Sequence, residues 1–133
     1  MREIKFRGKR LVNDEWVYGF LIQYENGWFI CNFIGDAYQY KVDPSTVGQY
    51  TGLKDKNGKE IYEGDICFVE IYDNFGTISK DECFYAKVVW MNNGFHLVDV
   101  NGKTWTEWMT DYNDSLEVVG NIYDNPELLK EVE

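Results

Sequence analysis

The sequence has one histidine, His96, and three cysteines, too few for several kinds of chemistry. Cys31, Cys67 and Cys83 share no CxxC spacing, so His and Cys cannot supply a tetrahedral zinc site. We expect the cysteines to be buried, reduced thiols. There is no GxxxxGK[ST] or GxGxxG phosphate loop, and no serine lies in a nucleophile-elbow motif. The sequence therefore predicts no enzyme: no catalytic residues, no cofactor and no metal.

Long apolar runs and proline are also scarce. No apolar run approaches the roughly 18 residues that cross a bilayer. The basic N-terminus lacks the apolar segment of a secretory signal. We therefore expect no membrane association and a cytoplasmic location. Two prolines and no low-complexity run favour a folded chain over a disordered one.

Aromatic residues are abundant, at 17% of the chain, and they fall in alternating patterns typical of strands. The clearest pattern has a strict period of two, so its members share one face: Trp16, Tyr18, Phe20, Ile22 and Tyr24. Asn-Gly pairs, which favour tight hairpins, begin at Asn26, Asn57, Asn93 and Asn101. The fold class predicted is all-β.

The order of the predicted strands suggests one domain, residues 1–133, with three parts. Residues 1–55 form an N-terminal β-sheet. It packs on a C-terminal SH3-like barrel, residues 60–123, with an opening strand, a variable loop, a three-stranded meander and a closing strand. Asn125 and Pro126 suit the start of a short C-terminal helix, residues 125–133.

Charge is distributed unevenly along a chain of net charge −10. Residues 61–133 hold four Lys/Arg against fifteen Asp/Glu, a net of −11, whereas residues 1–60 are nearly balanced. An acidic surface disfavours nucleic acid and favours a basic protein partner. The same charge could serve solubility alone, and a homo-oligomer could form between the basic N-terminal strand and the acidic half.

Two groups of residues are candidates for binding. Trp105 and Trp108 are three positions apart, so on a strand they face opposite ways and one lies near the surface. The candidate binding surface is Trp105, Glu107, Trp108, Asp111, Tyr112 and Asp114. The alternative is that these rings are buried. A second hypothesis is nucleic-acid binding by the basic N-terminal strand and the 54–59 hairpin.

Glu63 and Asp65 lie two residues apart at the start of a predicted strand. Such a pair could hold a divalent cation. The simpler interpretation is a turn in which Asp65 accepts hydrogen bonds from nearby backbone N–H groups.

Several motifs are similar to those of one known family. They are residues 1–8 (MREIKFRG), 42–55 (VDPSTVGQYTGLKD), 58–66 (GKEIYEGDI) and 118–129 (VVGNIYDNPELL). Together they resemble the YopX family, small proteins found mainly in bacteriophages and prophages. The resemblance implies an all-β fold with an SH3-like part, a phage or prophage origin and action in the host cytoplasm. It supplies no catalytic residues.

The central motif, residues 48–66, is interpreted as a determinant of the fold. Its signature residues set turns and cores: Gly48, Gly52, Leu53, Asp55, Gly58, Tyr62, Glu63, Gly64, Asp65 and Ile66. The sequence therefore leads to this hypothesis: a non-enzymatic phage or prophage accessory protein, with an acidic surface that binds another protein.

Overall fold

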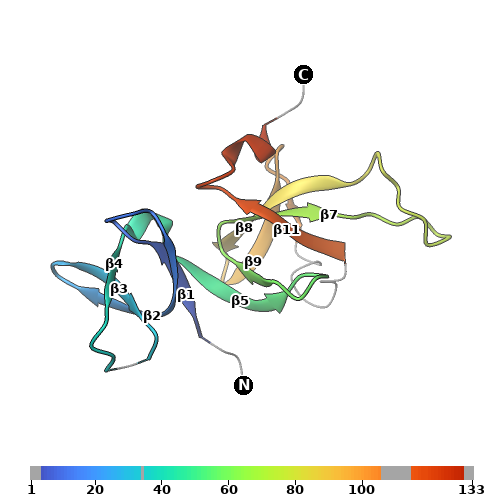
Figure 1. The fold of residues 1–133 in the computed structure, drawn as a ribbon. Coiled ribbons are helices and arrows are strands. Elements are labelled where there is room, and N and C mark those ends of the chain that lie inside the picture. Colours follow the sequence, from blue (N-terminus) through green and yellow to red (C-terminus); the bar gives the residue numbers. More distant parts are fainter. Residues whose placement is uncertain (1–3, 34, 106–114, 131–133) are drawn as a thin grey trace. The chain divides into compact units, whose positions relative to one another are not determined.

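The chain forms antiparallel sheets and no α-helix within the part that the computed structural model describes, residues 4–33, 35–105 and 115–130 (Figure 1). This confirms the all-β prediction. The chain divides into two compact units, residues 1–52 and 53–133.

The N-terminal unit is built on five strands in the order β4-β3-β2-β1-β5. Their bounds are β1 Phe6–Lys9, β2 Trp16–Tyr24, β3 Gly27–Cys31, β4 Tyr40–Val42 and β5 Gly48–Lys54. A 3-10 turn, η1 (Pro44–Thr46), precedes β5, and the Asp43 side chain caps it by accepting from the Ser45 N–H.

The end of β1 returns to β4, so these strands curl around a small core. Arg10 bridges to Val42, and the Asp43 N–H donates to the Lys9 carbonyl at 2.8 Å. Inside the curl, Ile30 and Val42 are almost fully buried. A Cβ on Gly8 would lie 3.1 Å from the Cβ of Val42, so glycine permits this close approach.

Five strands of the C-terminal unit form a second sheet, in the order β10-β9-β8-β7-β11. Their bounds are β7 Asp65–Val69, β8 Phe84–Met91, β9 Gly94–Asp99, β10 Thr104–Trp105 and β11 Leu116–Asn121. The short β6, Glu60–Tyr62, follows β5 in the first sheet. The core is an apolar cluster of Ile61, Cys67, Val69, Ala86, Val88, Leu97, Leu116 and Val118.

Three loops of this unit share one construction, in which an aspartate holds the backbone that follows it. The aspartate Oδ1 accepts from the N–H groups two and four residues on, and a glycine with positive φ stands at the third position. The distances are 2.8 and 2.9 Å for Asp55, 2.8 and 2.9 Å for Asp73, and 2.9 and 3.0 Å for Asp99. This is the side-chain-to-backbone bonding that favours Asp in turns.

Two finer predictions about the C-terminal half are not confirmed. The five strands predicted for residues 60–123 are present, but the described pairings leave β10 and β11 at opposite edges of an open sheet. The predicted helix at 125–133 is a single 3-10 turn in its described part, η4 (Pro126–Leu129). Asn125 makes no capping bond there, because its Oδ1 accepts instead from the Asn121 N–H at 3.2 Å.

Candidate functional site

The predicted binding surface is described in part. The structure describes Trp105, which is half-buried and packs against the core of the C-terminal unit. The other members lie outside the described residues: Glu107, Trp108, Asp111, Tyr112 and Asp114.

The loop 99–103 fixes the position of Trp105. Asp99 pairs with Lys103 through the Asp99 N–H and the Lys103 carbonyl at 3.0 Å, which closes the hairpin between β9 and β10. Register then places Trp105 opposite Leu97, a fully buried residue. The indole is therefore anchored by a tight turn on one side and by the core on the other.

Three neighbours hold the indole ring in place. Its N–H donates to Asp99 Oδ2 at 3.2 Å, and the Lys103 Nζ lies 4.0 Å from the ring centroid. Phe84 stacks on it, with centroids 5.0 Å apart and planes at 29°. Stacking and cation–π contacts of this kind restrict an aromatic side chain without burying it fully.

A pocket of about 490 Å³ opens beside the stacked pair, lined by Ile71, Glu82, Phe84 and Trp105. Three of these side chains are apolar or aromatic, and all three are half-buried. Glu82 is exposed and adds a carboxylate to the lining. Apolar walls with one charged group are typical of binding sites that accept an amphipathic group.

The pKa of Asp99 lies below its ordinary value. Its partial burial acts to raise the pKa, but the hydrogen bonds from Trp105 and from the Lys103 and Asn101 backbone more than offset that effect. Asp99 therefore stays ionised at neutral pH and keeps accepting from the indole.

Asp99→Asn is expected to lower the melting temperature by about 3 °C at pH 7, because an amide N–H would replace an acceptor facing the indole. A carboxylate with a depressed folded-state pKa contributes stability above its unfolded pKa of about 3.9. That contribution is lost as the pH falls through the folded value. The difference between wild type and variant should therefore shrink between pH 7 and pH 3, as thermal unfolding would show. A difference that stays constant would contradict this account.

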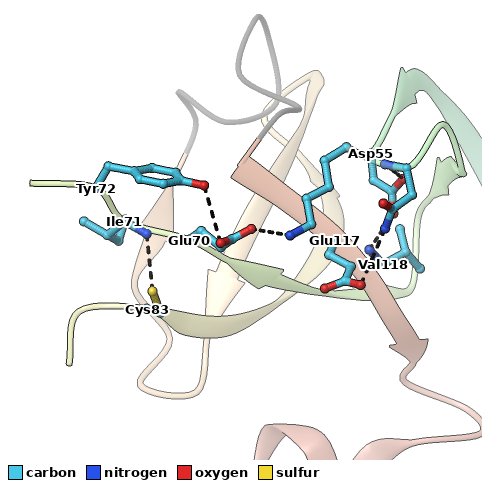
Figure 2. Close-up of polar contacts among 9 residues, drawn as sticks. Asp55, Glu70, Ile71, Tyr72, Cys83, Glu117 and Val118 are labelled. Atoms are coloured by element: carbon cyan, nitrogen blue, oxygen red, sulfur yellow. Dashed lines mark hydrogen bonds and ion pairs between the residues drawn. The ribbon is translucent and has the colours of Figure 1, made fainter. Parts of the chain in front are cut away.

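The loop from residue 70 to residue 83 forms one wall of the pocket. The Ile71 N–H donates to the Cys83 Sγ at 3.4 Å (Figure 2), and the Ser79 N–H donates to the Ile71 carbonyl at 2.7 Å. Tyr72 and Ile78 form an isolated bridge farther along. The variable loop predicted between the opening strand and the meander thus forms an arm whose two sides are hydrogen-bonded.

At the base of this arm, Glu70 binds a lysine of the family-like central motif. Its carboxylate pairs with Lys56 and accepts from the Tyr72 hydroxyl at 3.4 Å, although Glu70 is only 7% exposed (Figure 2). The hydrogen bond with Glu70 raises the pKa of Lys56. Lys56, which the nucleic-acid hypothesis placed on a binding hairpin, is thus engaged within its own unit.

Two of the signature acids, Asp55 and Asp65, serve the fold. Asp55 Oδ2 accepts from the Val118 N–H at 2.9 Å, tying the central motif to β11 (Figure 2). Asp65 is 2% exposed and its Oδ2 accepts from the Tyr62 N–H at 2.7 Å, as the turn interpretation predicted. Among the described residues, no cluster of three or more His, Cys, Asp or Glu could hold a metal ion.

The remaining chemically active side chains lie in structural positions. His96 contacts the Met91 carbonyl through Nε2 at 2.9 Å, at the β8–β9 hairpin. Cys31 and Cys67 are buried, Cys83 is half-buried, and all three thiols are free. Burial raises the pKa of the Cys67 thiol, so this group stays protonated.

Sequence reasoning did not find the other walls of the pocket. Ile71, Glu82 and Phe84 come from 21 to 34 positions before Trp105, and strand pairing brings them together. One signal was present in the sequence: Asp55-Lys56-Asn57-Gly58-Lys59 and residues 99–103 (DVNGK) share a pattern. That repeat marks the loop that positions Trp105.

Two comparisons with known proteins gave matches. The family model described as YopX protein matches residues 5–130. The crystal structure of protein EF1440 from Enterococcus faecalis is similar, with a TM-score of 0.60 and 23% identity over 98% of this chain and 100% of that one. A search of curated proteins gave no match. The described part contains no helix long and apolar enough to span a membrane. The match to the family model covers nearly the whole chain, and the protein therefore belongs to the YopX family.

Proposed function

We propose that this protein is a non-enzymatic accessory protein of phage or prophage origin that binds another protein in the host cytoplasm. The observation that carries the proposal is the pocket beside Trp105 and Phe84, with its apolar walls and one exposed carboxylate. We also propose that the C-terminal sheet is SH3-like, since its five strands follow the predicted order. Peptide binding on aromatic side chains is known for that fold class, which is an argument by analogy.

The chemistry of the pocket selects a basic side chain. Lysine and arginine combine an aliphatic stem, which apolar walls accept, with a cation that a carboxylate binds. Glu82 supplies the carboxylate, and Ile71 and Phe84 supply walls. The net charge of −11 over residues 61–133 would also speed the encounter with a basic partner. We therefore propose a basic segment of a host or phage protein as the ligand.

Selection of peptides from a random library tests the proposal. The immobilised protein is expected to enrich peptides with Lys or Arg beside apolar residues. Trp105→Ala should weaken the best peptide by about 30-fold or more, because buried aromatic anchors dominate such interfaces. Binding is measured by titration at low and moderate salt, since charge steering weakens as salt rises.

Glu82→Gln separates recognition from folding, because Glu82 is exposed and its replacement leaves the core intact. This variant should weaken basic peptides by about fivefold, the effect of one charged contact of about 1 kcal/mol. Asp81→Asn is the matched control: Asp81 is an exposed neighbouring acid outside the pocket lining. Equal losses in the two variants, or peptides that bind Trp105→Ala as tightly as wild type, would contradict the proposal.

A further inference from the structure

The outer face of β2 carries a row of mostly aromatic side chains, several of which remain exposed. Leu21 pairs with Ile30, which is 1% exposed inside the curl, so Leu21 lies on the inner side of the strand. Alternate residues of β2 face outward. These form the outer row: Trp16, Tyr18, Phe20, Ile22 and Tyr24.

The outer row is substantially exposed. Tyr18, Phe20 and Tyr24 have exposed fractions of 46%, 37% and 49%. Outward positions of an antiparallel strand commonly hold polar residues, and a contiguous apolar patch on a surface marks an interaction site. The N-terminal unit buries Ile30 and Val42 on the opposite side of the strand. On the outer side, Cys31 and Arg7, which pair with Phe20 and Tyr18, are 1% and 5% exposed, while the rings themselves keep much of their surface open.

Basic side chains accompany the outer row. The Arg7 Cζ and the Lys9 Nζ lie 4.6 Å and 5.5 Å from the Trp16 ring centroid. At the other end, Lys41 pairs with Phe29, whose ring contacts Tyr24 edge-on at 5.5 Å. The described acids of this unit are confined to turns and loops: Asp14, Glu15, Glu25, Asp36 and Asp43. Among the described residues of this unit, the strand positions of this face thus carry rings and cations without carboxylates, although Arg7 is only 5% exposed.

We propose that this face binds single-stranded nucleic acid, with bases stacking on Tyr18 and Phe20 and phosphates near Lys9 and Lys41. Successive outward residues of a strand are about 6.7 Å apart, roughly twice the spacing of stacked bases, so a base fits between or upon neighbouring rings. Rings interleaved with cations are the usual construction of such surfaces. This site is separate from the pocket at Trp105 and does not depend on the protein-binding proposal.

Charge argues against two other occupants of this face, a second copy of the chain and duplex nucleic acid. A second copy docking through the same face about a two-fold axis would bring the cationic strands of both copies together, at an electrostatic cost. A duplex hides its base faces inside the stack and would meet the surface only through phosphates. With a net charge of −10, the protein gains little from phosphates alone. Stacking is then the main source of affinity, which requires unpaired bases.

Fluorescence anisotropy with a labelled oligothymidylate of about 20 nucleotides, as DNA and as the RNA equivalent, tests this on the intact protein at about 50 mM salt. We expect binding of at least one oligonucleotide. Tyr18→Ala and Phe20→Ala should each weaken it about tenfold, whereas Tyr18→Phe, which keeps the ring, should bind like wild type. Tyr85→Ala is the matched control, because Tyr85 is 38% exposed on β8 of the other unit. Circular dichroism would check that all variants fold.

Several results would overturn the proposal. One is the absence of binding to either oligonucleotide by wild type. Others are losses in Tyr85→Ala as large as those in the two outer-row variants, or equal affinity for the matching duplex. Sedimentation equilibrium would identify the remaining occupant: a dimer of the wild type that Tyr18→Ala dissociates would assign the face to a second copy.

Discussion

Asp55→Ala is expected to lower the free energy of unfolding by about 3 kcal/mol. The carboxylate is 4% exposed and accepts three backbone hydrogen bonds, from Asn57, Lys59 and Val118, at 2.8 to 2.9 Å. Bonds to a charged acceptor are worth more than neutral ones, and the buried Val118 N–H would be left without this acceptor. Urea unfolding followed by circular dichroism would measure the change.

Asp73→Ala is the matched control for this prediction. Asp73 holds its loop with the same two backbone bonds, at 2.8 and 2.9 Å, but that loop is exposed. Water can replace the lost acceptor there, so the expected change is about 0.5 kcal/mol. Comparable losses in the two variants would show that the bond to Val118 contributes little.

Gly19→Ala should destabilise the N-terminal unit by about 3 kcal/mol or prevent its folding. A Cβ at this position would lie 2.1 Å from the Cys31 carbonyl oxygen and 3.0 Å from its carbon. Both atoms belong to the backbone of the paired strand β3, so no side-chain rotation relieves the clash. The φ of +153° is also unfavourable for alanine. Thermal unfolding and the fluorescence of Trp16 and Trp28 would report the loss.

Gly94→Ala provides the comparison, because this glycine also lies on a strand. Its added Cβ would meet the His96 Nε2 at 3.7 Å, an ordinary contact. The expected effect is within about 0.5 kcal/mol of zero, with a small gain from reduced freedom of the unfolded chain. If Gly19→Ala were as mild, the close approach of β2 and β3 would not be a constraint.

The sequence predicted the strands well where alternation was strong. The aromatic alternation from Trp16 to Tyr24 marks β2 with its observed bounds. The Asn-Gly signals found the hairpins, but the turn predicted at Asn26-Gly27 is misplaced by one residue, and Gly94, predicted to be part of a turn, begins a strand. Tyr24 pairs with Gly27, and Met91 pairs with Gly94, so the turns lie at residues 25–26 and 92–93. Asparagine itself accepts positive φ, as both residues of the second turn show, which leaves the glycine free to begin the strand.

Periodicity alone could not tell which side of β2 is buried. Period two places five apolar residues on one face, and such a face ordinarily packs on a core. The return of β1 to β4 at Arg10 and Val42 decides otherwise, because it puts the core on the opposite side. That contact joins residues 32 positions apart, and no local pattern encodes it.

Of the four described residues that line the pocket, the sequence predicted only Trp105. Trp105 was recognised as an aromatic on a strand near acidic residues, but its partner Phe84 comes from another strand. Their contact depends on the pairing of β8 with β9 and of β9 with β10. The prediction of a C-terminal helix was not confirmed, for a different reason. Asn125 is a suitable N-cap residue, but its side-chain oxygen accepts a hydrogen bond from the Asn121 N–H instead. The tertiary structure, and not the local sequence, determines this contact.

The hydrogen bonds of β11 set an order of events during synthesis. The central motif makes two hydrogen bonds to this strand. The Val118 N–H donates to Asp55, and the Lys56 N–H donates to the Leu116 carbonyl. Strand β7 also pairs with β11 along one of its edges, so this edge has no partner until β11 has been synthesised. The strands of the N-terminal unit, by contrast, find one another within the first 50 or so residues. On the ribosome, the first unit can therefore fold while the second remains incomplete until residues 116–121 have emerged.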